Sequence, residues 1–271
     1  MPVTLLISLL ILSPPHVVST EIRGSVEASM ARKLPQDGPP LAAQVARLLK
    51  WKGDIVRNIH PGDQLRIAYA PGEVPQLQAI YYKGLQIKLE AYAVDDGGGI
   101  PRFYDAEGVL VEPHIKKNPV PKYVQITDIV QQGRGKRKHQ GVDFKAPAGT
   151  PIKLPYSGTV SRVNWLRRVN GNCVEVEYRD GSFGRFLHLK HVDQSVKPGR
   201  RLSAGSPLGT VGSTGRSGAP HLHYEIRSSK GKMHDPLKYH GTRKGKITET
   251  QRRNFERARK QYRALLNIPR R

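Results

Sequence analysis

The sequence predicts a mostly β protein, with a small α+β module near the N-terminus and a helix at the C-terminal end. Its 27 glycines and 21 prolines are spread along 271 residues without a repeat, a distribution typical of many short strands joined by turns. Hydrophobic residues make up 37% of the chain, enough for one large or two modest domains with cores of their own. Alternating apolar and polar residues recur between Gly, Pro and Asn, which is the pattern of half-buried strands.

The N-terminal end carries an apolar run from Val3 to Leu12. About ten residues are too few to span a bilayer but match the h-region of a secretory signal peptide. We therefore expect residues 1–20 to be a signal peptide, the mature chain to have no transmembrane span, and the protein to be exported. No Lys or Arg precedes Arg23, so a buried strand or a retained anchor is the alternative. Cys173 is the only cysteine, which excludes an internal disulfide.

Residues 21–118 are predicted to form the α+β module. Apolar residues between Leu41 and Trp51 recur with the period of an amphipathic helix. Three strand-like segments follow, punctuated by GD, PG and KG pairs: Gln64 to Ala70, Leu77 to Tyr82 and Leu85 to Val94. The glycine-rich run Asp95 to Gly99 predicts a turn, and residues 102–112 predict a further strand pair. The polar, proline-containing segment Lys116 to Tyr123 predicts a linker.

Residues 119–239 are predicted to form a sheet-rich domain, and residues 240–271 a basic helical tail. Thr248 and Gln251 form a capping-box pattern at the start of this helix. Its apolar residues share one stripe: Phe255, Ala258, Tyr262, Leu265 and Leu266. The whole chain has 45 Lys and Arg against 22 Asp and Glu, so its surface should attract polyanions. The candidate partners are nucleic acid and an anionic cell-wall, envelope or lipid surface, and charge alone does not choose between them. Nucleic acid is not expected, because the only aromatic residues of the tail lie on the apolar stripe.

Three distant stretches supply side chains with the chemistry of a catalytic zinc site: His139, Asp143, His188, His221 and His223. Such a site takes three protein ligands, usually imidazoles with one carboxylate, and keeps a fourth position for water. His139 and Asp143 are four residues apart, but Gly141, Val142 and Pro147 are poor residues for a helix interior. An extended chain would separate the two side chains by about 13 Å, too far to share an ion. We therefore predict a bend at Gly141, with His139 on a loop and Asp143 at the head of a strand.

His221 and His223 alternate in the strand-like run HLHYEI, so both imidazoles should point the same way. His188 lies in a second alternating run, GRFLHL, whose inward residues would include Phe186. A single histidine in a strand is weak evidence for a metal. Six others are expected to be bystanders: His16, His60, His114, His191, His234 and His240.

These stretches resemble the lysostaphin-type (LytM-type) zinc endopeptidases, which cut the peptide part of bacterial peptidoglycan. The similarity covers about residues 122–239 and is carried mainly by HQGVDFKAPAGTPI (His139 to Ile152), FLHL (Phe186 to Leu189) and KPGRRLSAGSPLGTVGSTGRSGAPHLHYEIR (Lys197 to Arg227). It implies an antiparallel β-sheet peptidase fold with one zinc ion per chain. It also implies metal ligands at His139, Asp143 and His223, and catalytic roles for His188 and His221.

The upstream segment IVRNIHPGDQLRIAY (Ile55 to Tyr69) is similar to the small domain that precedes the peptidase in Gram-negative envelope members of this family. A regulatory or wall-binding role for residues 21–118 is therefore a hypothesis. The loop from Gln131 to Lys138 is short and basic, whereas relatives often carry an arginine and a further His-Pro segment before the first ligand. Which cross-link is accepted is left open.

The resemblance implies a zinc-dependent endopeptidase that hydrolyses peptide cross-links of bacterial peptidoglycan during cell-wall remodelling. The alternative is a non-catalytic wall-binding or amidase-activating envelope protein. Members of that kind have lost ligands, whereas all five positions are filled here. The oligomeric state is not predicted.

Overall fold

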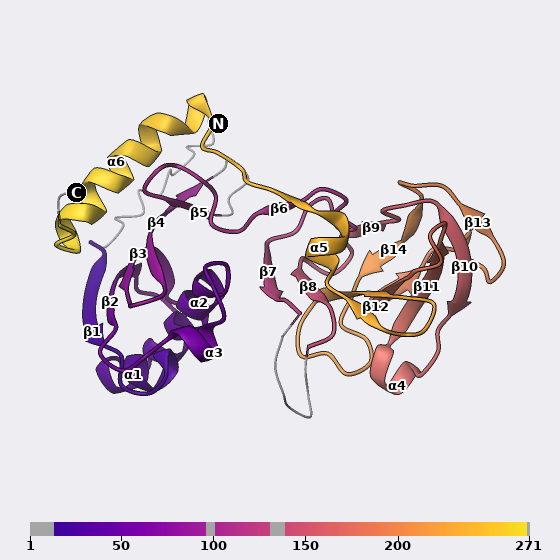
Figure 1. Cartoon of the computed structure of the whole chain (residues 1–271), viewed down its shortest axis with the longest axis horizontal. Coiled ribbons are helices and arrows are strands. Elements are labelled where there is room, and N and C mark those ends of the chain that lie inside the picture. The colour runs from indigo at the N-terminus through magenta and orange to yellow at the C-terminus, as the bar shows by residue number, and fades with distance from the viewer. Residues whose placement is uncertain (1–13, 96–100, 131–138, 270–271) are drawn as a thin grey trace, which may run out of the picture. The chain divides into compact units, whose positions relative to one another are not determined.

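The chain forms two compact units (Figure 1). The structure is a computed structural model that describes residues 14–95, 101–130 and 139–269. The first unit combines Met1–Glu112 with Lys246–Arg271, and the second unit is the continuous segment Pro113–Gly245. The second unit is therefore an insertion into the sequence of the first. Three predicted features lie outside the described residues, wholly or nearly so: the apolar run at Val3 to Leu12, the glycine-rich turn and the basic loop before His139.

The first unit is built around a five-stranded antiparallel sheet in which neighbours in sequence are neighbours in the sheet. Its strands are β1 (His16–Glu21), β2 (Gln64–Ala70), β3 (Gln76–Lys83), β4 (Lys88–Asp95) and β5 (Pro101–Asp105). The strands predicted from alternation match β2, β3 and β4. Residues 106–112 do not add a full strand, since their pairing is limited to isolated bridges from Leu110 to Tyr104 and from Val109 to Lys246.

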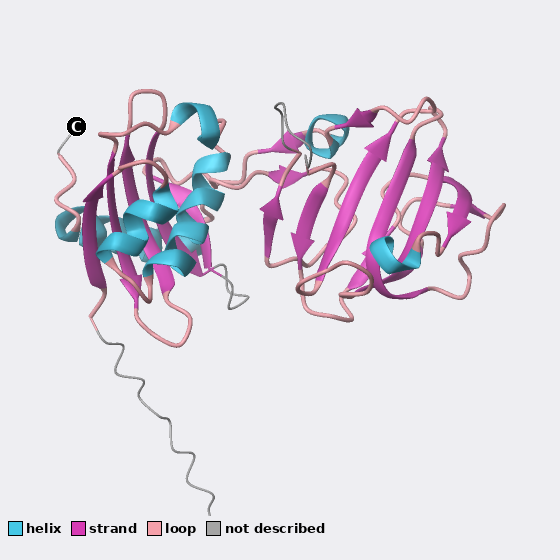
Figure 2. Ribbon diagram, turned by 90° about the horizontal axis from the view of Figure 1, so that it is seen from below, coloured by secondary structure: helices cyan, strands magenta, loops and turns pink. Residues whose placement is uncertain are grey.

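Both faces of this sheet are covered. Successive side chains of a strand point to opposite sides, so apolar residues on both faces need packing partners. Helices lie against one face (Figure 2), where Leu41 and Val45 pack with Ile67 and Ile80. The helices of this part are α1 (Val26–Lys33), α2 (Gly38–Lys50) and α3 (Ile55–Asn58). Helix α2 contains the predicted amphipathic segment.

The C-terminal helix α6 (Glu249–Leu265) covers the other face of the same sheet. Its predicted capping box is present at Thr248 and Gln251. Phe255 is 2% exposed and Leu266 is 1% exposed, and both pack in a cluster that includes Tyr92 of β4. Leu265 is 40% exposed, so it does not belong to the buried stripe. The helix is thus part of the core of the first unit.

The second unit contains a ten-stranded sheet whose main path runs β13-β10-β11-β12-β15-β8-β7. Its central strands are β8 (Val142–Lys145), β11 (Asn172–Tyr178), β12 (Phe183–Val192) and β15 (His221–Arg227). The outer strands of the path are β7 (Gln125–Asp128), β10 (Gly158–Val163) and β13 (Arg201–Leu202). Off the path, β14 (Pro207–Val211) pairs with β12 and β9 (Pro151–Lys153), and β16 (Met233–His234) pairs with β15. The remaining elements are β6 (His114–Ile115), α4 (Arg167–Asn170), α5 (Pro236–His240) and β17 (Thr242–Arg243). The predicted mostly β, antiparallel architecture is confirmed.

Several predicted boundaries differ from those of the structure. The predicted signal segment, residues 1–20, overlaps β1, which pairs with β2 along its whole length and packs Val18 against the core. The predicted linker Lys116 to Tyr123 is packed into the second unit, with Val120 0% exposed and the Tyr123 ring edge-on to Phe144. The predicted separate tail, residues 240–271, divides between the units at Gly245 and Lys246. Within the described residues, no helix combines the length and hydropathy needed to cross a membrane.

Candidate metal centre

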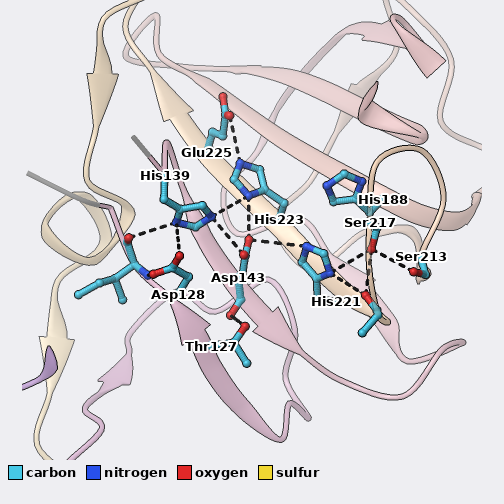
Figure 3. A network of polar contacts seen from close by, with 12 residues as sticks. Thr127, Asp128, His139, Asp143, His188, Ser213, Ser217, His221, His223 and Glu225 are labelled. Atoms are coloured by element: carbon cyan, nitrogen blue, oxygen red, sulfur yellow. Dashed lines mark hydrogen bonds and ion pairs between the residues drawn. The ribbon is translucent and has the colours of Figure 1, made fainter. Parts of the chain in front are cut away.

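Three of the predicted residues converge where β8 and β15 pair. Asp143 of β8 lies directly opposite His223 of β15 in the antiparallel register. His223 Nδ1 is 2.7 Å from Asp143 Oδ1, and His139 Nε2 is 3.1 Å from Asp143 Oδ2. The two imidazole nitrogens are 3.2 Å apart, and Figure 3 shows all three side chains turned towards one another. Residues 84 and 80 positions apart in sequence are thus brought to one point by a single strand pair.

This donor set fits a zinc ion. Ligands of a tetrahedral zinc, each about 2.1 Å from the metal, lie about 3.4 Å from one another. Here the two imidazole nitrogens are 3.2 Å apart, and each lies close to one oxygen of Asp143, at 2.7 Å from Oδ1 and at 3.1 Å from Oδ2. One ligand atom from each of the three residues lies within 4.8 Å of the others. Two imidazoles with one carboxylate are also the donor types of hydrolytic zinc sites, and a small outward movement of the side chains admits the ion. His139, Asp143 and His223 are therefore the residues that could hold a metal.

The protonation of these ligands is set by their mutual hydrogen bonds. Burial opposes ionisation of Asp143, but hydrogen bonds from His139 and His223 outweigh it and hold the pKa of this carboxyl well below its usual range. Burial likewise opposes protonation of His223, but its bonds to Asp143 and Glu225 raise its pKa to about 9. The pKa of His139 is raised as well, since its bond to Asp143 outweighs burial. A cation that binds here must replace protons on the two imidazoles.

His188 and His221 lie beside this group and share one tautomer. His188 Nδ1 is 2.9 Å from the carbonyl oxygen of Thr214, and His221 Nδ1 is 2.8 Å from that of Ala219. A carbonyl only accepts, so each Nδ1 carries the proton and each Nε2 is left as an acceptor. His221 Nε2 is 3.8 Å from Asp143 Oδ1. The ring centroids of His188 and His221 are 4.9 Å apart. Burial lowers the pKa of His188, and the neighbouring His221 adds to this effect, so His188 is held neutral.

The backbone of His188 departs from regular strand geometry. Its φ is 65°, in the left-handed region that non-glycine residues rarely adopt. The pairing of β12 with β11 shifts by one residue between Phe186 and Leu189, which is the signature of a β-bulge. Strict alternation would place His188 on the same face as Phe186, as the sequence suggested. The bulge instead turns the imidazole towards His221, while Phe186 packs on Tyr224 with ring centroids 4.9 Å apart.

Gly141 serves the site in a different way from the one predicted. The chain does bend there, and Asp143 follows as the second residue of β8, but Gly141 does not have a positive φ. A Cβ at this position would lie 2.4 Å from the carbonyl oxygen of Tyr224 and 3.0 Å from Nε2 of His223. The glycine is therefore needed because β15 passes so close, not because the bend requires unusual backbone angles.

Two acidic residues next to the ligands were not recognised from the sequence. Glu225 Oε1 lies 3.1 Å from His223 Nε2, and Asp128 Oδ2 lies 3.9 Å from His139 Nδ1. His139 Nδ1 is also 3.1 Å from the carbonyl oxygen of Ile129. Alternation in HLHYEI offered a signal for Glu225, since it shares a face with His221 and His223. Asp128 comes from a separate strand, and no local pattern links it to His139.

The second unit matches the model of a known protein family, described as peptidase family M23, over residues 137–236. This segment is a peptidase M23 domain. Among its relatives, the peptidoglycan DD-endopeptidase ShyB of Vibrio cholerae serotype O1 is 31% identical over 227 residues, covering 77% of this chain and 50% of ShyB. ShyA of the same organism, also a peptidoglycan DD-endopeptidase, is 30% identical over 196 residues, covering 68% of this chain and 44% of ShyA. The chain thus spans about half the length of these Vibrio relatives.

Solved structures with a similar chain include a zinc-containing peptidase from Vibrio cholerae. It is 28% identical with a TM-score of 0.41, covering 82% of this chain and 70% of that one. The matched M23 segment contains all five predicted site residues, and the structure places all five together. His191, a predicted bystander on the same strand as His188, is exposed and pairs with Thr210.

Proposed function

We propose that this chain is a zinc-dependent endopeptidase that hydrolyses peptide cross-links of bacterial peptidoglycan. The observation that carries the proposal is the convergence of His139, Asp143 and His223 next to two further imidazoles of fixed tautomer. The names of the Vibrio relatives, peptidoglycan DD-endopeptidases, support the substrate class.

The chain's own residues supply the proton handling. A zinc ion bound by the three ligands would polarise a carbonyl and lower the pKa of its water towards neutrality. His221 presents an unprotonated Nε2 on the metal side of the site, so it is the residue placed to take up the proton of that water and pass it to the leaving amine. His188 also presents Nε2. When the one proton that the pair takes up rests on His188 instead of His221, the resulting imidazolium would stabilise the negative charge that develops on the carbonyl oxygen.

The two catalytic histidines are coupled through charge. Their ring centroids are 4.9 Å apart, and the presence of His221 lowers the pKa of His188. Two imidazolium ions at this distance are disfavoured, so the pair takes up only one proton beyond the two that the neutral rings carry on Nδ1. The proposed division of roles follows from this, with His221 as the first acceptor because it lies nearer to Asp143.

The alternative is a non-catalytic wall-binding or amidase-activating envelope protein. It would leave unexplained why two additional imidazoles are fixed beside a complete ligand set, one of them at a bulge with left-handed backbone.

We also propose that the chain works in the cell envelope after export, in keeping with the peptidoglycan substrate. The exposed basic residues of α6, among them Arg253, Arg257 and Lys260, are candidates for contact with the anionic wall.

The decisive experiment is digestion of purified sacculi followed by mass analysis of the fragments. The zinc-loaded protein should convert cross-linked peptide dimers into monomers that gain one water for each bond cut, and a chelator should prevent this. His221→Ala should be inactive, whereas His191→Ala, a change at an exposed histidine of β12, should remain active. Intact dimers after incubation with the zinc-loaded protein would reject the enzyme and favour the binding protein.

Wall retention is tested separately by pelleting the protein with sacculi at rising salt concentration. Removing the whole tail is unsuitable, because α6 contributes Phe255 and Leu266 to a core. Replacing Arg253, Arg257 and Lys260 by Gln keeps the helix and removes only charge. If the proposal holds, the variant is released at lower salt than the wild-type chain. An unchanged salt profile would assign these residues to solvation alone.

A further inference from the structure

The ligand His223 has a second polar partner on the side away from the ligand group. Its Nε2 lies 3.1 Å from Glu225 Oε1, two residues further along β15, and the Glu225 side chain is only 8% exposed. Figure 3 shows Glu225 on the opposite side of the His223 ring from Asp143. A carboxylate accepts, so this contact keeps a proton on Nε2, and Nδ1, which faces His139 and Asp143, is the nitrogen left to give up its proton and offer a lone pair to a metal.

Glu225 is itself held by guanidinium groups. Arg227 approaches Glu225 Oε2 through Nε and Nη2, both at 2.8 Å, and Arg185 of β12 lies 3.6 Å from the same oxygen. Arg185 in turn binds Glu175 of β11 at 2.6 Å. A buried carboxylate with two arginine partners is fixed in both position and charge.

Arg227 also reaches the segment that carries the second histidine ligand. Its Nη2 donates a hydrogen bond to Oε1 of Gln140, the residue that follows His139 in the chain. Through Glu225 the same guanidinium holds His223. One side chain, 13% exposed, therefore links two ligand-bearing segments that are 84 positions apart in sequence.

We propose that Glu225 and Arg227 are positioning residues of the metal centre. Glu225 fixes the tautomer and ring orientation of His223, and Arg227 locks Glu225 while tying it to the His139 segment. This inference rests on the proposed zinc site and concerns its affinity and geometry. Neither residue touches the substrate or the metal, so their effect is read in metal binding rather than in turnover alone.

The forked guanidinium of Arg227 serves two partners. Arg227 makes contacts with Glu225 and Gln140 at once, which a planar guanidinium can do and a single ammonium cannot. Glu225→Gln keeps the side-chain volume and an accepting oxygen but removes the charge that holds Arg227. Loss of an outer partner of this kind typically weakens metal binding by about 10- to 100-fold.

The test measures the dissociation constant of zinc by competition with a chelator, together with the visible absorption of the cobalt-substituted protein. We compare the full-length wild-type chain with Glu225→Gln, Glu225→Asp, Arg227→Lys and the control Glu177→Gln, a change at an exposed position of β11. Glu225→Gln and Arg227→Lys should weaken zinc binding by about 10- to 100-fold and alter the cobalt spectrum. Glu225→Asp should recover part of the affinity, and Glu177→Gln should match the wild type.

The thermal midpoint of each metal-free variant shows whether the fold persists, and Arg227→Lys serves if Glu225→Gln does not fold. Wild-type affinity and an unchanged cobalt spectrum in both Glu225→Gln and Arg227→Lys would overturn the inference while leaving the proposed function intact. A wild-type chain that binds no zinc would instead reject the proposed function together with this inference.

Discussion

Phe186 and His188 are separated by one residue on β12, yet their side chains lie on opposite faces of the sheet. Phe186 packs on Tyr224 in the core, whereas His188 lies beside His221 at the metal centre. The left-handed backbone at His188, with φ 65°, makes this possible. The position of this proposed catalytic residue is thus created by an irregularity of the strand, which costs an L-residue about 1–2 kcal/mol.

The strain at this position can be measured with two substitutions. Both His188→Ala and His188→Gly remove the imidazole, so both should lose most turnover. Glycine adopts the left-handed conformation without a steric penalty, so His188→Gly should be more stable to denaturant than His188→Ala, by about 1 kcal/mol. A more stable alanine variant would contradict the assignment of strain to this residue.

The proposed ligands and the proposed catalytic histidines should respond differently to removal. His139→Ala and Asp143→Ala each delete one of three converging donors, so zinc should be lost from the purified protein. His188→Ala leaves the donors intact and should retain zinc while losing turnover. Elemental analysis after dialysis gives the metal content. Stoichiometric zinc in either ligand variant would refute the ligand set.

Zinc binding should weaken as the pH falls. The pKa of His223 is raised to about 9, so at lower pH the zinc must displace a proton from Nδ1. Each displaced proton should reduce the apparent affinity by about tenfold per pH unit below this pKa. Chelator competition between pH 6 and pH 9 provides the measurement. An affinity that does not change over this range would show that His223 is already unprotonated there.

His240 should make the second unit sensitive to acid. This imidazole is 6% exposed, shares a hydrogen bond with the Tyr224 hydroxyl, and has a pKa lowered to about 4 by burial and by Lys117. The unfolded chain therefore takes up the proton first, and the stability contributed by neutral His240 is complete above about pH 6.5 and is lost as the pH falls towards 4.

The size of that loss is on the order of 3 kcal/mol. Denaturant titrations with a chelator present should show a flatter pH profile for His240→Gln than for the wild type. The control His234→Gln changes an exposed histidine of β16 and should keep the wild-type profile. A parallel profile for His240→Gln would exclude this residue as the source.

The C-terminal helix should stabilise the first unit. Phe255 is 2% exposed and packs edge-on to Tyr92 of β4, so Phe255→Ala removes a large buried side chain. The expected cost in the free energy of unfolding is about 3–5 kcal/mol. Arg257→Ala, a change at an exposed site on the same helix, is the control. Equal unfolding midpoints for the two variants would mean that α6 does not belong to the cooperative core.

Much of the secondary structure could be predicted from local patterns. The strands Gln64–Ala70 and Gln76–Lys83 alternate clearly, and the capping box at Thr248 marks the start of α6. Local patterns do not show which surface each element packs against. The apolar stripe of α6 predicted that the helix packs on a core, but not on which sheet. Nothing in the polar segment around Val120 predicted that Val120 is buried.

The site was predicted as a set of residues but not as a geometry. Alternation correctly placed His221 and His223 on one face of β15, since that strand is regular. It failed at His188, because a bulge changes the period locally. It also missed Asp128, whose nearness to His139 depends on β7 lying beside β8 in the sheet. Pairing between strands distant in sequence decided these features.

The first unit takes its sheet from one end of the sequence and α6 from the other. During synthesis, residues 1–112 leave the ribosome before the M23 segment, and the helix that covers Tyr92 and Val94 emerges only after it. The M23 segment is continuous and can complete its own sheet first. One apolar face of the nascent sheet therefore stays open for the time needed to translate 113–245, which makes it a natural binding surface for chaperones.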